Sequence, residues 1–177
     1  MLVLKGGRAL SDSRFAHLSY DIASLNHGAS LLEASHIYLA DIDPEYLVDK
    51  DRLMKLLNSS SIDPSHDQSY STSRLRIVAP RVGTISPWSS KATDIARNCG
   101  FWGIRRIERA VVYEFDNWPL DKVAHSLDSL ISDRMVETVF DSSDDLLGLF
   151  KRAHPKSFSE IDVINQGIKA IQKANFL

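Results

Sequence analysis

The stretch from residue 104 to residue 115, IRRIERAVVYEF, carries the strand signal that decides the fold. It combines β-branched and aromatic side chains, which favour an extended backbone. Its apolar members include Ile104, Val111, Val112 and Phe115. The pattern predicts two consecutive strands or one long bent strand.

Helices and strands are expected to alternate on both sides of this stretch. In the first half we expect a strand at 1–5, a helix from Ser11 to Gly28, an extended or hairpin segment at 31–42, and a helix beginning at Asp49 or Asp51. In the second half we expect a strand at 75–79 stopped by Pro80, a helix capped by Ser89 or Ser90 and ended by Gly100, the extended stretch 104–115, a helix with Pro119 near its first turn, and a last strand at 135–140. Capping serines and aspartates and terminal glycines set these helix boundaries.

This order predicts an α+β fold built from a duplicated β-α-β-β-α-β unit, which is ferredoxin-like. Two such units would form one antiparallel sheet with helices on one side. We place the pseudo-repeats at about 1–57 and 75–140, within a domain covering 1–140. Between them, residues 58–73 form a serine-rich loop with too little apolar surface to fold alone.

The C-terminal part, 141–177, is expected to add helices to this domain. Helical segments are predicted at 142–152 and 159–175, with a break at Pro155. The last segment has an apolar face that no later element covers, formed by Ile161, Ile164, Ile168 and Ile171. Such a face favours self-association or poor order at the C-terminus.

Composition excludes several classes of protein. The chain has 177 residues, 21 Lys plus Arg against 23 Asp plus Glu, and one cysteine. This charge balance argues against a general nucleic-acid binder, which needs clustered positive charge. No stretch approaches the ~20 apolar residues of a membrane span. A single cysteine cannot form an internal disulfide, so we expect a cytoplasmic protein.

Motifs of the common catalytic and metal sites are missing from the sequence. It contains no phosphate loop, no G-x-G-x-x-G, no H-E-x-x-H and no G-x-S-x-G. Its six histidines are not spaced as metal ligands. Cys99 lies in the last turn of its predicted helix, where the helix dipole disfavours a thiolate. We therefore expect no catalytic residue, metal or cofactor in this chain.

The densest polar signal is RVGTISPWSSKATD, residues 81–94. A loop stiffened by Gly and Pro that delivers serines to a helix N-terminus suits an anion or a partner's carboxylate. The candidate residues here are Thr84, Ser86, Trp88, Ser89, Ser90, Lys91 and Asp94. The alternative is an ordinary capped helix in which Trp88 closes the core and Lys91 is solvated.

Two further charged groups are weaker candidates. Arg106, Glu108 and Arg109 lie in the extended stretch, where they form either the solvated face of a sheet or a binding surface. Asp133 and Arg134 follow a predicted helix and fit a local ion pair and turn as well as an interface.

A run of these motifs is similar to a known family. GTISPWSSKATDIARNCG at 83–100, RIER at 106–109 and DRM at 133–135 resemble the N-terminal region of the large single-chain phosphoribosylformylglycinamidine synthases (FGAM synthases, or FGAR amidotransferases). Shorter matches lie at 6–11 and 167–175. Arg97 and Ala110 depart from the pattern, since many members have histidine and glycine there.

The resemblance implies a reaction in which ATP activates the formamide oxygen of formylglycinamide ribonucleotide and ammonia from glutamine displaces it. In that family the N-terminal domain resembles a fused dimer of the small S-type subunit of multi-subunit versions. ATP and Mg belong to later synthetase domains, and the glutaminase residues belong to a C-terminal domain. The chain alone is therefore expected to be inactive, as part of a longer enzyme.

The implied role is a scaffold that docks the synthetase and glutaminase domains so that ammonia passes between them. Its partner-facing element would be 84–94, with Trp88 and Lys91 as the first contacts. One alternative is a stand-alone S-type adaptor that assembles separate synthetase and glutaminase chains. Another is a small phosphate-ligand-binding protein that uses the helix start at 84–94.

Overall fold

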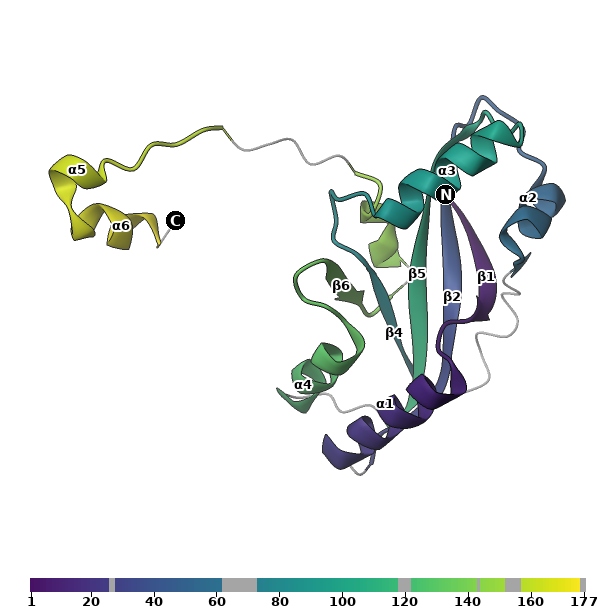
Figure 1. Ribbon diagram of the computed structural model, residues 1–177, viewed down its shortest axis with the longest axis horizontal. Helices are drawn as coiled ribbons and strands as arrows, with labels where there is room; N and C mark the ends of the chain where they lie inside the picture. The colour runs from purple at the N-terminus through teal and green to yellow at the C-terminus, as the bar shows by residue number, and fades with distance from the viewer. Residues whose placement is uncertain (26–27, 62–72, 118–121, 143, 152–156, 176–177) are drawn as a thin grey trace.

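The fold is an α+β arrangement around one antiparallel sheet (Figure 1), seen in a computed structural model that describes residues 1–25, 28–61, 73–117, 122–142, 144–151 and 157–175. The strands are β1 (Leu2–Arg8), β2 (Ser30–Ile42), β3 (Ser60–Ser61), β4 (Ser73–Pro80), β5 (Ile104–Asp116) and β6 (Glu137–Phe140). The helices are α1 (Asp12–Leu25), α2 (Lys50–Leu57), α3 (Pro87–Asn98), α4 (Lys122–Ile131), the 3-10 helix η2 (Asp144–Gly148), α5 (Val163–Gln166) and α6 (Ile168–Ala174). The six strands follow the order β3-β1-β2-β5-β4-β6.

Two long strands form the centre of the sheet. β2 and β5 are each 13 residues long and pair along their whole length, from Ser30 opposite Asp116 to Ile42 opposite Ile104. Of the alternatives for 104–115, one long strand is therefore correct, and of those for 31–42, an extended segment is correct; the two-strand and hairpin alternatives are wrong. Neither segment contains Gly or Pro, so nothing in them makes a turn. The register of the pairing between β2 and β5 shifts next to Glu33 and again between Asp41 and Ile42.

The two halves of the chain place their strands in mirrored positions. Outward from the centre, the order is β2, β1, β3 on one side and β5, β4, β6 on the other. The observed unit is thus β-α-β-α-β and not the expected β-α-β-β-α-β. The third strand of the first unit is β3, whose two residues pair with Leu4 and Lys5 of β1. Both residues of β3 lie in the segment predicted to be a loop. The remainder of that serine-rich segment, 62–72, lies outside the described residues.

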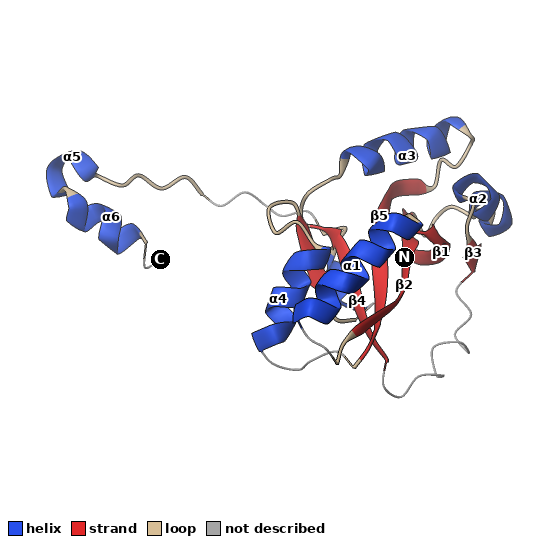
Figure 2. Cartoon of the chain, turned by 60° about the horizontal axis from the view of Figure 1, so that its bottom comes forward, coloured by secondary structure: helices blue, strands red, loops and turns tan. Residues whose placement is uncertain are grey.

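Helices α1 to α4 cover one face of the sheet in two groups. Near one end, Ile22 of α1 and Leu127 of α4 pack with Phe115, and Figure 2 shows the two helices side by side. Near the other end, Leu53 of α2 and Ala96 of α3 pack on strand residues that include Leu4, Ile104 and Ile107. Both groups use alternate positions of β5, which places them on the same face.

The opposite face of the sheet is covered by η2. Leu146 and Leu149 are fully buried there against Ile37, Ile77 and Ala110. The expectation that helices lie on one side holds for α1 to α4 but not for this element. The helix predicted at 142–152 is also shorter than expected, because among its described residues only Asp144–Gly148 is helical, and as a 3-10 turn.

Most helix starts agree with the sequence signals. The Ser11 hydroxyl accepts a hydrogen bond from the Arg14 N–H at 3.4 Å, and Asp49 caps α2 by accepting one from the Arg52 N–H at 3.0 Å. The predicted role of Pro119 and the break at Pro155 lie outside the described residues.

The C-terminal helices differ from the prediction in one respect. The single helix expected at 159–175 is two short helices, because Gly167 between them has a φ of +59°. The expected apolar face is present and uncovered, with Ile164 96% and Ile168 73% exposed. In Figure 1, α5 and α6 stand apart from the sheet.

Candidate functional site

Helix α3 closes an edge of the central strand β5. The pairing of β4 with β5 ends at Val78 opposite Val111, so the remaining part of β5 has no strand on that side. Backbone groups on a buried edge need other hydrogen-bond partners. The Ser89 hydroxyl donates to the Ile107 carbonyl at 2.6 Å, and the Thr93 hydroxyl accepts from the Ile107 N–H at 2.9 Å.

Arg97 continues this row of contacts. Its guanidinium donates to the carbonyls of Ile104 at 3.3 Å and Arg105 at 2.9 Å. Ser89, Thr93 and Arg97 are four residues apart and therefore lie along one face of α3. This face of α3 makes the backbone hydrogen bonds to β5 that a neighbouring strand would otherwise make. Ser89 is fully buried and is neither the cap nor a partner-facing residue.

The cap of α3 is Ser86, so the prediction of Ser89 or Ser90 is wrong. The Ser86 hydroxyl accepts the Ser89 N–H at 3.0 Å and donates to Glu108 Oε1 at 2.6 Å. Pro87 takes the first helical position, where it lacks only an N–H that would have had no helical partner. The proline moves the helix start three residues earlier than the serine pair suggested.

Glu108 is a fully buried carboxylate at the N-terminus of α3. It accepts hydrogen bonds from the N–H groups of Ser86 at 3.4 Å and Arg109 at 3.0 Å, and Arg106 lies 2.7 Å from Oε2. Arg106 also donates to the Thr84 carbonyl at 2.7 Å and to the Ser89 hydroxyl at 3.2 Å. We call Ser86, Arg106 and Glu108 the carboxylate clamp. The interpretation of this charged cluster as a solvated sheet face is wrong.

The carboxylate clamp has a consequence for anion binding. A helix N-terminus attracts an anion through its free N–H groups and its dipole. At α3 an internal carboxylate already occupies that position, and Arg106 neutralises it. An external phosphate would have to displace Glu108, so the geometry does not favour the phosphate-binding alternative at 84–94.

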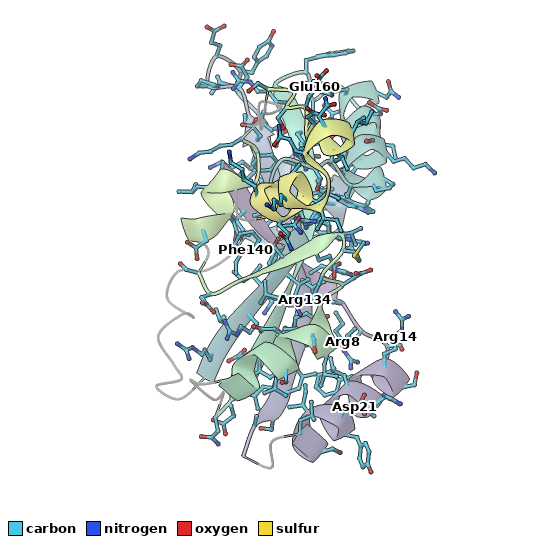
Figure 3. All side chains as sticks on the ribbon, turned by 90° about the vertical axis from the view of Figure 1, so that its left-hand side faces the viewer. Arg8, Arg14, Asp21, Arg134, Phe140 and Glu160 are labelled. Carbon is cyan, nitrogen blue, oxygen red and sulfur yellow. The ribbon has the colours of Figure 1, made fainter. Side chains whose placement is uncertain are left out.

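Two loops from distant parts of the sequence meet beside the carboxylate clamp. Arg81 joins them: its N–H donates to the Val136 carbonyl at 3.0 Å, and its guanidinium donates to the Met135 carbonyl at 3.4 Å. Within the second loop the Asp133 carboxylate accepts the Met135 N–H at 2.9 Å, so the expected turn is present. The described residues show no ion pair between Asp133 and its neighbour Arg134. Figure 3 labels Arg134 on the connection that precedes β6.

The joined loops present apolar side chains to solvent. The exposed fractions are Val82 50%, Ile85 63%, Met135 79% and Val136 58%. We call residues 82–85 and 133–136 the twin-loop surface. Exposed apolar residues gathered on two linked loops are typical of a protein interaction site.

The other candidates on α3 divide between buried and exposed positions. Trp88 is half-buried, stacks on Tyr38 with ring centroids 5.6 Å apart, and has the Arg109 guanidinium 5.1 Å from its ring centre. This supports the alternative in which Trp88 packs on the core. Ser90, Lys91 and Asp94 are exposed, as is Thr84 in the preceding loop.

A hollow of about 880 Å³ lies beside α3, lined in part by Ser90, Asp94 and Lys151. The arginines that line it already have partners: Arg105 pairs with Asp43 at 3.0 Å, and Arg97 and Arg106 make the contacts described above. The hollow therefore offers little uncommitted positive charge. Among the described residues, no cluster of three or more His, Cys, Asp or Glu could hold a metal ion. No helix in the described part is long and apolar enough to cross a membrane.

Comparison with known families shows to which family the chain belongs. The model of the formylglycinamide ribonucleotide amidotransferase N-terminal region matches residues 35–150, more than half of the chain. The chain belongs to this family. The match covers α3, β5 and both parts of the twin-loop surface. FGAR amidotransferase is an enzyme of purine biosynthesis.

Several residues that stabilise this FGAR amidotransferase N-terminal domain were not identified from the sequence. Thr93 and Arg97 could have been found, because they follow Ser89 at intervals of four residues and therefore lie on the same face of a helix. Arg76 of β4 is 8% exposed and pairs with Asp128 of α4 and with Asp141. No local pattern predicts these two ion pairs, since the three residues are far apart in the sequence.

Proposed function

We propose that this chain is the N-terminal scaffold domain of an ATP- and glutamine-dependent FGAM synthase of de novo purine biosynthesis. It docks the synthetase and glutaminase domains so that ammonia passes from one to the other. The family match supports the enzyme context, and we include a cytoplasmic site of action in the proposal. The mirrored strand order supports the further proposal that the domain is a fused pair of S-type units.

The observation that carries the proposal is the support beneath the twin-loop surface. Docking by exposed loops is efficient when they are held in one conformation before binding, because less entropy is then lost. Here Arg81 ties the loops together, and Arg106 holds the Thr84 carbonyl from the buried side. The apolar side chains of Ile85 and Met135 are thereby presented on a fixed backbone.

The candidate residues then divide into two roles. We assign Thr84, Lys91, Asp94, Asp133 and Arg134 to the partner-facing side, because they are exposed on or next to the twin-loop surface. Ser86, Ser89, Arg106 and Glu108 are positioning residues that hold α3 and the first loop in place. Trp88 contributes mainly by packing, so Trp88→Ala is expected to act through stability.

The test compares two exposed isoleucines in an FGAM synthase that carries this domain. Ile85→Ser changes the twin-loop surface, and Ile95→Ser changes a residue of α3 that is 54% exposed, against 63% for Ile85. We expect Ile85→Ser to lower the glutamine-dependent rate several-fold more than the ammonia-dependent rate. The Ile95→Ser enzyme should keep the normal ratio. Equal ratios in both variants and in Lys91→Ala would refute the docking role.

A further inference from the structure

Arg109 is the one charged member of the RIER motif that the carboxylate clamp does not use through its side chain. Arg106 and Glu108 pair with each other, and only the backbone N–H of Arg109 contacts Glu108. The Arg109 side chain lies on the helix-covered face of the sheet, where Tyr38 is its cross-strand neighbour. Its guanidinium lies over the Trp88 ring at 5.1 Å.

Five other cations of the described strands have carboxylate partners within the chain, and a sixth, Arg74, is exposed. Lys5 pairs with Glu33 at 3.3 Å, Arg8 with Asp12 at 2.7 Å, and Arg76, Arg105 and Arg106 make the pairs given above. In the part of the chain that the structure describes, no carboxylate pairs with Arg109. A half-buried arginine without a counterion is costly, because its charge is partly removed from water.

A second polar side chain lies next to Arg109. His36 is diagonal to it on β2, since His36 is opposite Val111 and Tyr38 is opposite Arg109. The Nδ1 atom of His36 is buried and has no hydrogen-bond partner within the described residues. Burial lowers the pKa of His36 and the positive charge of Arg109 lowers it further, whereas a hydrogen bond with the Ala110 backbone raises it in part.

The backbone next to these groups is packed closely. A Cβ on Gly6 of β1 would lie 2.8 Å from the Tyr38 ring and 3.0 Å from the His36 Cβ. A Cβ there would be closer to both residues than ordinary van der Waals contact, so glycine allows β1 to pack against Tyr38 and His36.

We propose that Arg109, with His36 beside it, receives a carboxylate side chain from the protein domain that docks on this chain. The inference rests on the proposed docking function. Charge complementarity selects the occupant: a half-buried guanidinium without an internal carboxylate partner in the described residues matches a planar carboxylate, with which it forms two parallel hydrogen bonds. The neighbouring His36 ring senses the charge that binds there, and the Trp88 ring lies against the guanidinium.

The first test uses the full chain and a carboxylate probe, followed by NMR of the Arg109 Nε–H and the His36 ring nitrogens. Sodium acetate is titrated against sodium chloride at constant ionic strength. Both signals should shift saturably with acetate and the pKa of His36 should rise, because a negative charge now lies beside it. Arg109→Gln should abolish the response of His36, whereas the matched Arg105→Gln should leave it unchanged. Equal effects of acetate and chloride would overturn the proposal, as would much tighter binding of inorganic phosphate.

The second test separates this inference from the docking function. The probe is the synthetase–glutaminase portion of an FGAM synthase, and the dissociation constant is measured for each variant. Arg109→Gln should weaken binding about tenfold or more, with Arg109→Lys intermediate and Arg105→Gln near wild type. Thermal unfolding checks that each variant is folded. If Ile85→Ser weakens binding but Arg109→Gln does not, the carboxylate receptor is refuted while docking stands. If the wild-type chain does not bind, the docking function fails and the acetate titration alone decides the role of Arg109.

Discussion

Removing the carboxylate of Glu108 should be among the most damaging single changes in this domain. Glu108 is fully buried and accepts hydrogen bonds from four donors: the Ser86 hydroxyl, the N–H groups of Ser86 and Arg109, and the Arg106 guanidinium. Glu108→Ala leaves Arg106, whose side chain is only 15% exposed, as an uncompensated charge. Breaking a buried pair in this way costs about 3–5 kcal/mol.

The size of the effect can be measured by urea denaturation and by thermal unfolding. For a domain of this size, 1 kcal/mol corresponds to roughly 2–4 °C, so the midpoint should fall by about 6–20 °C. A double-mutant cycle with Arg106→Met isolates the pair. The double variant Arg106→Met/Glu108→Ala should be more stable than the sum of the two single effects predicts, because no lone charge stays buried. A loss under about 1 kcal/mol for Glu108→Ala, or strictly additive effects, would refute this account of the carboxylate clamp.

Three other predictions concern the edge of β5, the half-buried histidine His36 and the C-terminal helices. Thr93→Val leaves the Ile107 N–H without its acceptor and should cost about 1–3 kcal/mol in urea denaturation, whereas Ser90→Ala, on the exposed side of α3, should cost much less. Because the pKa of His36 is lowered in the folded state, the unfolded chain binds more protons below about pH 6.5, so stability should fall as the pH drops below that value. In His36→Gln the difference in stability between pH 7.5 and pH 5.5 should be smaller than in wild type; an equal difference would contradict the assignment. Ile164→Ser with Ile168→Ser should reduce self-association in sedimentation velocity, and an unchanged distribution would show that this apolar face does not drive it.

The sequence was sufficient where a local pattern determines the structure. The apolar and β-branched run at 104–115 predicted β5, and Asp49 predicted the start of α2. Both signals depend on the residue and its immediate neighbours. The α+β class and the antiparallel sheet followed from such elements taken together, although the repeated unit is β-α-β-α-β and not the predicted one.

The role of α3 could not be predicted because it depends on tertiary structure. Ser89 and Ser90 have the same chemistry and adjacent positions, yet Ser89 bonds to the Ile107 carbonyl whereas Ser90 is exposed. Only the early end of β4 at Pro80 explains why a serine is needed on that side. The burial of Glu108 also depends on tertiary structure and could not be predicted, because an acidic residue in a strand is ordinarily solvated. β3 was missed because two serines pair with β1 without any strand propensity of their own.

The central claim is that this FGAR amidotransferase N-terminal domain docks through its twin-loop surface. Hydrogen exchange of the chain, measured alone and with the synthetase–glutaminase portion of an FGAM synthase, tests it most directly. Binding should slow exchange of the amides at 82–85 and 133–136 and leave the exposed outer side of α2 unchanged. Protection confined to other segments, or no protection at concentrations that restore glutamine-dependent activity, would contradict the claim.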